Sequence, residues 1–498
     1  MARGDGKDAT GGGAAGRRYL VLAICCMSLL IVGLDNTIVN VALPSIGREL
    51  HTRVSGLQWT VDAYVLVVAS LLMLSGSTAD RLGRRRTFQV GLVVFSLGSL
   101  LCSLAPSVQL LVAFRALQAV GGSMLNPVAM SIITNTFTDR RERAQAIGIW
   151  GAVVGLSMGL GPVVGGVLVT SVGWRSIFWI NVPIGLAACV LTALFVPESK
   201  APRPRRFDPV AQLLMVVGLA SITYAIIEGA RRGYTSGPIL GAFAVFGAAV
   251  PVFLVYERHR PEPLIDIRFF RSAPFSGANA IAVASFAGLG GFLFLNTLYL
   301  QESRGLSALQ AGLYTLPMAV LTVLSAPVSG ALVGRRGARP PLLAAGGLLA
   351  ASGLMLTRIT PTTSVVWLFV AYTFFGAGFG LVNAPITNSA VSGMPDSQAG
   401  VAAAIASTSR QIGQVLGVAV LGALATASLH GPVVTGLAAA SHTGWWVLAG
   451  CGLVVMALGM AVTTPRALAS ADRVTALFDD SAGLRPGPGP RTSPQTVQ

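Results

Sequence analysis

Long apolar runs alternate with short polar segments along most of the chain, and this pattern predicts its elements directly. Fourteen of the runs approach or exceed the roughly 20 residues that an α-helix needs to cross the hydrocarbon core of a bilayer. They fall near residues 20–42, 57–77, 88–105, 108–131, 145–169, 176–196, 209–229, 237–256, 277–300, 311–333, 341–357, 364–391, 402–425 and 443–463. The pattern therefore predicts an all-α polytopic membrane protein with 14 transmembrane helices.

The composition agrees with this interpretation. Of the 498 residues, 53% are hydrophobic and 11% are charged, whereas soluble globular domains carry about 25% charged residues. The five cysteines, at positions 25, 26, 102, 189 and 451, all lie in apolar runs without the spacing of metal ligands. We interpret them as small hydrophobic residues, and we expect neither a disulfide framework nor a metal site.

The formal net charge of +16 would suit a nucleic-acid-binding protein, but the positions of the charges favour another reason. Twenty-six of the 35 Lys and Arg residues lie in the N-terminal tail, the even-numbered loops or the C-terminal tail, and only seven lie in the odd-numbered loops. Cytoplasmic loops of membrane proteins carry such an excess of positive charge. We therefore predict that both termini are cytoplasmic, that the protein resides in the inner (cytoplasmic) membrane, and that it binds no nucleic acid.

Two pairs of segments resemble each other at nearly the same spacing. GSTADRLGRRR begins at Gly76 and returns as GALVGRRGARP from Gly330, and LVAFRALQAVGGSMLNP begins at Leu111 and returns as FVAYTFFGAGFGLVNAP from Phe369. The two offsets, 254 and 258 residues, indicate a duplication of about six spans. Parallel six-helix repeats of this kind place a substrate site at their interface, near the bilayer midplane.

The duplication divides the chain into five expected parts. They are a disordered cytoplasmic tail (1–18), an N-terminal six-helix bundle (19–196), inserted helices 7 and 8 with flanking basic loops (197–276), a C-terminal six-helix bundle (277–463) and a second disordered cytoplasmic tail (464–498). The charges Asp80 and Arg115 have no counterpart in the second copies, where Gly334 and Thr373 stand. We therefore expect ionisable chemistry to concentrate in the first half.

Asp35, in the stretch LDNTIVNVALP, is the only charged residue between Arg18 and Arg48. A carboxylate within a span has to pair, take up a proton or face a water-filled cavity. Its pKa responds to burial and to a nearby cation, so it suits proton coupling. The alternative is a hydrogen bond to a neighbouring helix alone. Asn36 and Asn40, four residues apart on a helix, are candidates to orient this carboxylate or to bind substrate.

Arg115 lies inside the fourth span and needs a counter-ion or several acceptors. Asp35 is the natural candidate, and Gln118, one turn on, is expected to share the network. A purely structural pairing of Arg115 with backbone carbonyls is the alternative. Arg410 enters the thirteenth span, where it either takes part in gating or extends its side chain to the membrane surface.

The segment WTVDAY contains a second acidic residue within a span, Asp62. It is either a second proton site or cation-attracting group beside Trp59 and Tyr64, whose rings can hold cations, or an interfacial acid exposed to water. Glu228, at the end of the seventh span, is more simply explained as an interfacial residue paired with Arg231 or Arg232.

Two further motifs suit conformational change. In the short basic loop after span 2, Asp80 can lie at a helix N-terminus or bond Arg84, and such contacts would hold one conformational state of the protein and break in the other. The residues of this conformational latch are Gly76, Asp80, Arg81, Gly83, Arg84 and Arg85. In span 5, small residues permit close helix approach and a proline bends the helix; they are Gly159, Gly161, Pro162, Gly165 and Gly166. Ordinary packing of small residues is the alternative for this motif.

These motifs, in this order, resemble the 14-helix drug:proton antiporter family of the major facilitator superfamily over about residues 19–463. LDNTIVNVALP is similar to that family's helix 1 signature, WTVDAY to its helix 2 segment, GSTADRLGRRR to the loop between helices 2 and 3, RALQAVGG to the helix 4 arginine motif and GLGPVVGG to the helix 5 antiporter motif. GWRSIFWINVPIG and SRQIGQVLGVAVLG are also similar. Ala119 and Ser157 stand where the family usually has glycine. The resemblance implies that Arg115 perturbs the proton-carrying acid and that span 5 serves antiport.

The residues and the resemblance together predict a proton-coupled antiporter that exports hydrophobic or cationic drugs or antibiotics across the cytoplasmic membrane by alternating access. The chain has no Walker loop, so we expect no cofactor and a proton gradient as the energy source. The expected partners are a small-molecule substrate, protons and the lipid bilayer, and we expect a monomer.

Three other functions are possible on the sequence alone. The main alternative is a proton-coupled symporter that imports a small metabolite on the same fold. A polytopic membrane enzyme such as an acyl transferase would need a histidine beside a nucleophile within the membrane, but the four histidines (51, 259, 430 and 442) all lie outside the spans. A sensor that does not transport is disfavoured because Asp35 and Arg115 are both present.

Overall fold

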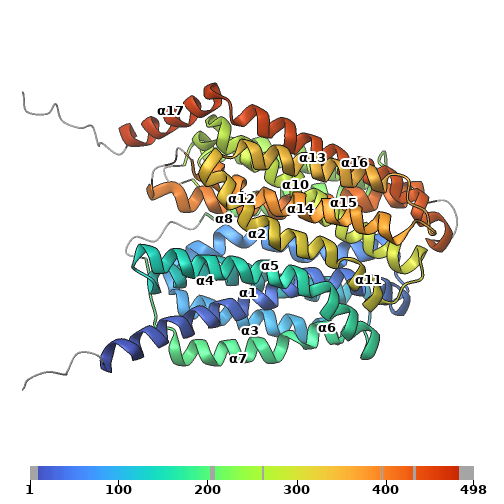
Figure 1. The fold of residues 1–498 in the computed structure, drawn as a ribbon, viewed down its shortest axis with the longest axis horizontal. Coiled ribbons are helices and arrows are strands. Elements are labelled where there is room, and N and C mark those ends of the chain that lie inside the picture. Colours follow the sequence, from blue (N-terminus) through green and yellow to red (C-terminus); the bar gives the residue numbers. More distant parts are fainter. Residues whose placement is uncertain are drawn as a thin grey trace, which may run out of the picture.

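The computed structural model describes residues 9–201, 208–260, 263–392, 394, 396–429 and 433–481, and every regular element in this part of the chain is helical (Figure 1). The first set of helices is α1 (Ala9–Glu49), α2 (Val54–Leu82), α3 (Arg84–Ser103), α4 (Val108–Thr136), α5 (Arg140–Ser171), α6 (Ser176–Trp179) and α7 (Asn181–Phe195). Next come α8 (Pro209–Arg232), α9 (Gly237–Arg258) and a 3-10 turn, η1 (Ile267–Arg271). The last set is α10 (Ala273–Leu298), the π-helical η2 (Tyr299–Ser303), α11 (Ala308–Tyr314), α12 (Leu316–Arg336), α13 (Arg339–Leu356), α14 (Val365–Val391), α15 (Asp396–Ser428), α16 (Val433–Val462) and α17 (Pro465–Ser481).

Fourteen helical segments of the described chain are long and apolar enough to cross a membrane, which confirms the number predicted from the sequence. Three of them join adjacent elements: α6 with α7 (Ser176–Phe195), α10 with η2 (Ala273–Ser303) and α11 with α12 (Ala308–Arg336). The predicted all-α membrane fold is therefore correct.

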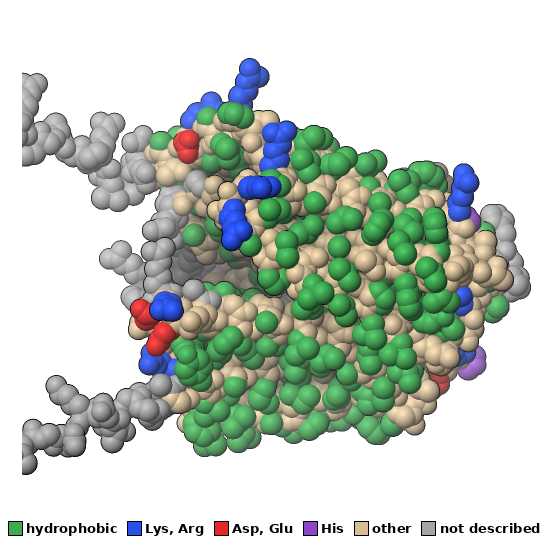
Figure 2. Space-filling model, viewed as in Figure 1, with side chains coloured by type: hydrophobic (Ala, Val, Ile, Leu, Met, Phe, Trp, Pro, Cys, Tyr) green, Lys and Arg blue, Asp and Glu red, His purple; other side chains and the backbone are tan. Residues whose placement is uncertain are grey.

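The flank of the molecule is apolar and its two ends carry the charges (Figure 2). On α3 the exposed residues Val90, Val93, Leu97 and Leu100 are three or four positions apart, so they form one stripe along the helix. Such a stripe on a soluble protein would be a liability, whereas in a bilayer it faces lipid. We call the end of the molecule where α1 begins and α17 ends the terminal end, and the opposite end the far end.

The helices form two lobes, with α1 to α7 in one and α10 to α16 in the other (Figure 1). Contacts between the lobes are reciprocal: α2 packs on α15, and α5 packs on α11 and α12. Helix α2 is the second span of its set and α15 the fifth, while α5 is the fifth span and α11 with α12 the second. This exchange of second and fifth spans supports the proposed duplication.

The helices between the two sets, α8 and α9, pack on each other, and α8 also packs against α2 and α15 beside the seam. The Asp208 side chain fastens the pair: it caps α8 through the amides of Val210 and Ala211 and accepts hydrogen bonds from Tyr256 and Arg260 of the α9 end, each at 3.0 Å. Burial acts to raise the pKa of Asp208, but these hydrogen bonds and the Arg260 charge hold it below its ordinary value.

Glu228, at the last turn of α8, accepts hydrogen bonds from Arg231 at 2.8 Å and Arg232 at 3.2 Å. The interfacial pairing expected for Glu228 is confirmed.

The structure corrects the expected disordered tails. Helix α1 already begins at Ala9, and α17 occupies residues expected to be a disordered tail; residues 1–8 and 482–498 lie outside the described residues. The reason for α17 is an apolar face with helical spacing, formed by the buried residues Ala467, Ala471, Val474 and Phe478. The Phe478 ring lies 5.2 Å from that of Phe269 in η1. The amphipathic segment lies just before the Pro- and Gly-rich end, whose composition dominated the sequence prediction.

Candidate functional site

A buried polar cluster surrounds Asp35 in the middle of α1. Arg115 of α4 donates from Nη1 to Asp35 Oδ2 at 2.5 Å, and Gln118, one turn along, donates to Asp35 Oδ1 at 2.8 Å. Asn181, at the start of α7, donates to the same oxygen at 2.9 Å. All four side chains are almost completely buried. The pairing of Asp35 with Arg115 expected from the sequence is therefore present, and the carboxylate has three donors.

Arg115 is held from several sides. Its Nε donates to the backbone oxygen of Thr60 at 3.2 Å, its Nη1 also lies 2.6 Å from Gln118 Oε1, and its guanidinium stacks over the Tyr64 ring at 4.2 Å. Removing one member of a buried ion pair leaves an uncompensated charge and costs roughly 3–5 kcal/mol. The cluster is thus a tightly balanced set of charges, sensitive to any proton added to Asp35.

Sequence reasoning missed two members of this cluster, Asn181 and Ser99. Ser99 of α3 accepts from Gln118 at 2.6 Å and from Asn181 at 3.3 Å. Asn181 lies in the quoted GWRSIFWINVPIG motif, and an amide in an apolar span was a usable signal. Ser99 gave none, because serines are common in transmembrane helices.

Asp62 of α2 is fully buried, and neither of its carboxylate oxygens has a hydrogen-bond partner among the described residues. The interpretation of Asp62 as an interfacial acid exposed to water is therefore wrong. One turn earlier, Gln58 donates across the seam to the backbone oxygens of Val418 at 3.1 Å and Ala419 at 3.0 Å in α15. The inter-lobe contact of Gln58 was also missed from the sequence.

A cavity of about 1960 Å³ lies between the two lobes. Its mouth is at the terminal end, where Asp80, Asp208, Asp266 and Phe478 belong to its wall, and the surface is hollowed there between the lobes (Figure 2). Much of the wall is apolar, and the apolar residues include Leu29, Val32, Phe286, Leu289, Leu293 and Phe379. A large apolar chamber with few polar groups suits varied hydrophobic ligands.

Two of the five residues predicted to bind substrate line this cavity, Asn36 and Tyr64. Tyr64 also stacks on Arg115, so it connects the cavity with the buried cluster. Asn40 is buried against the Asn36 backbone, with its amide 3.1 Å from that oxygen, and Trp59 lies beside Tyr224 of α8 at 6.5 Å. Together with Gln118, these two are outside the described cavity wall in this conformation.

The far end of the cavity is closed by contacts between lobes. Gln414 of α15 donates to Asn36 Oδ1 at 3.1 Å, and Gln301 of η2 donates to the Val41 backbone oxygen at 2.8 Å. Beyond them Arg48, in the last turn of α1, pairs with Glu302 at 2.9 Å. The structure is therefore open at the terminal end and sealed at the far end.

We expect the Arg48–Glu302 pair to contribute little to this seal. The side chains are 62% and 20% exposed, and exposed ion pairs are worth at most about 1 kcal/mol, or roughly fivefold in a population. Arg48→Gln should raise the labelling rate of a cysteine placed at Val41 by no more than about fivefold. The swap Arg48→Glu/Glu302→Arg should restore the original rate. A much larger increase would contradict the assignment of the seal to buried contacts.

The predicted latch lies at the terminal end, and the side-chain bonds described for Asp80, Arg84 and Arg85 lie within the first lobe. Arg84 pairs with Asp80 at 3.0 Å, as the sequence allowed, and Gly83 has the positive φ of 114° that a residue with a side chain rarely adopts. The helix N-terminus expected for Asp80 is occupied instead by Glu198, which accepts from the amides of Arg85 at 3.1 Å and Arg86 at 3.3 Å.

The other latch residues surround this contact. Arg85 donates to the Ala193 backbone oxygen at 2.6 Å, and Arg81 is exposed. Gly76 and Asp80 line the cavity. The loop thus ties α3 to the segment that follows α7 and presents Asp80 at the mouth.

The glycines of α5 pack where the sequence predicted close approach. A Cβ on Gly161 or Gly165 would collide with Thr37 or Ile38 of α1. A Cβ on Gly166 would lie 2.6 Å from Leu309 Cα of α11 in the other lobe, whereas one on Gly159 would meet only Ala319 at 3.4 Å. Helix α5, which contains Pro162, therefore packs closely against α1 in its own lobe and against α11 in the other lobe. Among its glycines, Gly166 makes the closest contact with the other lobe.

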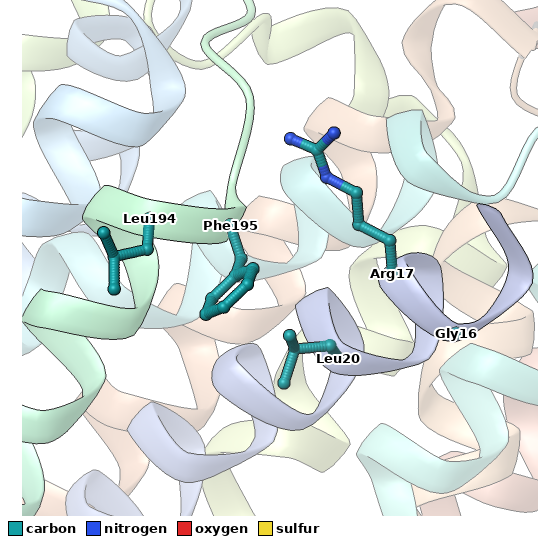
Figure 3. A pocket seen from close by; sticks show the side chains of 5 residues that line it. All are labelled: Gly16, Arg17, Leu20, Leu194 and Phe195. Carbon is teal, nitrogen blue, oxygen red and sulfur yellow. The ribbon is translucent and has the colours of Figure 1, made fainter. Parts of the chain in front are cut away.

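A second, smaller cavity of about 500 Å³ lies at the terminal end, between the beginning of α1 and the end of α7 (Figure 3). It is lined by Gly16, Arg17, Leu20, Leu194 and Phe195. Arg17 is 18 residues before Asp35 on the same helix, about 27 Å along its axis. This surface depression is separate from the polar cluster and the central cavity.

Comparison with known proteins agrees with this geometry. The multidrug resistance protein Stp of Mycobacterium tuberculosis is 37% identical over 412 residues, which cover 83% of this chain and 76% of the relative. The methylenomycin A resistance protein of Streptomyces coelicolor is 35% identical over 436 residues, covering 85% and 91%. The tetracenomycin C resistance and export protein of Streptomyces glaucescens is 34% identical over 414 residues, covering 83% and 77%.

Solved structures share the fold. A peptide transporter POT in complex with sulfate superposes with a TM-score of 0.65 at 16% identity, over 92% of this chain and 95% of that chain. A bacterial homologue of the human lysosomal transporter Spinster, inward-facing and occupied, gives 0.62 at 17% identity, over 93% and 98%. A family model, finally, matches residues 25–418, and its family consists of transporters, not enzymes. The chain belongs to the Major Facilitator Superfamily.

Proposed function

We propose that the protein is a proton-coupled antiporter that exports drugs or antibiotics from the cytoplasm by alternating access. One observation carries the proposal: a buried Asp35–Arg115 pair lies behind the wall of a large cavity that is open at one end and sealed at the other. The names of the relatives, which include resistance, efflux and export proteins, support the export direction.

The terminal end is proposed to face the cytoplasm. By their position in the sequence, 26 of the 35 Lys and Arg residues belong to the two tails and the even-numbered loops, which the positive-inside rule assigns to the cytoplasmic side. The present conformation is then open to the cytoplasm, ready to receive substrate. The protein would lie in the cytoplasmic membrane with both termini inside and act as a monomer.

Asp35 is proposed to carry the coupled proton. In the cytoplasm-open state its carboxylate accepts three hydrogen bonds, one of them from the Arg115 cation. A proton taken up from outside would neutralise Asp35 and loosen Arg115. When the cavity opens to the cytoplasm, Arg115 would pair with the carboxylate again and the proton would leave. Tyr64, which touches both the cavity and Arg115, would relay the presence of substrate.

Asp62 is proposed as a second proton carrier. A charged carboxylate buried without a partner is costly, whereas a neutral carboxylic acid is far less so. The isolation of Asp62, together with its position next to the seam contact made by Gln58, supports this role.

The latch and the α5 glycines are proposed to govern the movement of the lobes. Asp80 lies at the open mouth with a bond to Arg84 inside its own lobe, so it is available for new contacts when the mouth closes. Gly166 permits the close approach that seals the far end.

Transport by everted membrane vesicles tests the proposed function. With an acidic lumen, an antiporter should accumulate dye inside as protons leave, and an uncoupler should abolish the accumulation. The panel should contain a cation (ethidium), a neutral dye (N-phenyl-1-naphthylamine) and an anion (anthracene-9-carboxylate). A symporter on the same fold would move dye out of the lumen together with protons. That result, or no gradient-dependent movement of any dye, would contradict the proposal.

A further inference from the structure

Arg410 is the only charged residue in the described wall of the central cavity without an oppositely charged partner. The other charged residues of the wall lie at its mouth and are paired: Asp80 with Arg84, Asp208 with Arg260 and Asp266 with Arg268. Among the described side chains, no carboxylate lies within 4.0 Å of the Arg410 guanidinium. The cavity therefore carries one uncompensated positive charge.

The contacts of Arg410 leave part of its guanidinium unused. Nη2 donates to Thr387 of α14 at 2.7 Å, and Nη1 lies 3.4 Å from the Ser407 hydroxyl, one turn earlier on α15. Nε is buried and has no partner among the described atoms. A guanidinium has five N–H donors in a planar fork, so two neutral hydroxyls leave several donors for a ligand.

Arg410 lies deep in the cavity, not at its mouth. It follows Asp396, the first residue of α15, by 14 residues, which corresponds to about 21 Å of helix. Gln414, which bridges to Asn36 at the closed end, is one turn further along α15. The charge is thus placed next to the deepest part of the chamber.

Aromatic surface adjoins this charge. The Phe286 ring lies 6.0 Å from the Arg410 guanidinium, and Phe286 packs edge-to-face with Phe379 at 5.1 Å. Both rings line the cavity. The cluster therefore combines one cation with an apolar, aromatic wall.

The described cavity wall has no unpaired acidic side chain that could bind a cationic ligand. Asp35 is completely buried under three donors, and Asp62 is outside the described cavity wall. A cationic drug that entered this state would meet Arg410 and no available carboxylate within the described wall.

We infer that the cavity binds amphipathic acids: compounds whose anionic group, a carboxylate or an ionised phenol, pairs with Arg410 while their aromatic or apolar body packs on Phe286 and Phe379. Arginine matches carboxylate geometry with two parallel N–H···O bonds, and an ion pair is stronger in a low-dielectric chamber than in water. The inference rests on the proposed export function and narrows its substrates to a class that the sequence did not suggest.

Binding to the purified full-length protein in lipid nanodiscs tests this inference. The probes are anthracene-9-carboxylate and its uncharged methyl ester, which share one aromatic body. The wild-type protein should bind the acid about tenfold more tightly than the ester, since hydrogen bonds to charged groups are worth at least one factor of ten. Arg410→Gln should abolish this preference, and Arg410→Lys should keep part of it.

Arg232→Gln is the matched control, because it also removes one arginine charge but lies outside the cavity, paired with Glu228. It should retain the wild-type preference. Affinity for the ester should change by less than about threefold in all variants, a small effect beside the charge-assisted contact, and this verifies that each remains folded.

Two results would overturn the inference. One is a wild-type protein that binds the ester as tightly as the acid. The other is the same preference for the acid in wild type and Arg410→Gln; loss of transport of every dye in that variant would then make Arg410 a conformational element only. If the wild type shows the preference but its vesicles accumulate no dye, the export proposal fails and the binding site stands.

Discussion

Asp35→Asn is expected to abolish accumulation of dye against its gradient. With one proton exchanged per substrate, a difference of two pH units sustains about a 100-fold accumulation, because each unit is worth 1.36 kcal/mol. The asparagine cannot exchange a proton, and Asp62 has no arginine partner among the described residues to drive off its own proton, so the accumulation ratio should fall to about 1, the value for an uncoupled carrier. The measurement is the steady-state dye ratio in everted vesicles with an acidic lumen.

This variant also leaves Arg115 buried without a counter-ion, so loss of folding has to be separated from loss of coupling. Asp35→Asn/Arg115→Gln removes both charges, and replacing both partners of a buried interaction is far less damaging than removing one. The double variant should bind dye like the wild type and still fail to concentrate it. Glu228→Gln, which removes an acid paired with arginines outside the cavity, should accumulate dye normally. Undiminished accumulation by Asp35→Asn would refute the coupling role.

Gly166→Ala is expected to reduce transport by about tenfold, since forcing a methyl group into a packed contact typically costs 1–3 kcal/mol. The new Cβ would lie 2.6 Å from Leu309 Cα and 2.7 Å from the Ala308 backbone oxygen. These are backbone atoms of the opposite lobe, so α5 and α11 have to separate. We therefore expect the sealed far end to open more often, which faster labelling of a cysteine at Val41 from outside would report.

Gly159→Ala is the matched control on the same helix. Its Cβ would meet only the Ala319 side chain, at an ordinary 3.4 Å. Labelling and transport should stay within about twofold of wild type, because no overpacking arises. Equal effects of the two substitutions would show that helix propensity, not the inter-lobe contact, is responsible.

The sequence was informative wherever a residue conflicted with its surroundings. A carboxylate and a guanidinium in apolar runs have few ways to be satisfied, so the pairing of Asp35 with Arg115 followed from the sequence. Gln118, one turn from Arg115, followed from helical spacing. The same reasoning identified Glu228 with its two neighbouring arginines, because the pair is local on one helix.

The long-range partners could not be predicted. Asn181 and Ser99 reach the Asp35 cluster from α7 and α3, and Gln58 bridges to α15. A polar side chain in a span signals that it needs a partner without naming the helix that supplies it. Asp62 is the strongest case, because burial in place of exposure to water depends on how the helices pack around it.

By itself, the sequence determined the number of spans, the uneven distribution of positive charge between the loops and the central acid with its arginine, and it predicted a duplicated plan. These properties depend on local hydrophobicity, charge count and the high free energy of a charge in lipid, which all act through single segments. Only the tertiary structure decided which end is open, that Glu198 rather than Asp80 occupies the start of α3, and that Arg410 lies beside two phenylalanines in the cavity with no acidic partner among the described residues. Those features arise where helices distant in the chain meet, and side-chain contacts between helices leave no periodic pattern in the sequence.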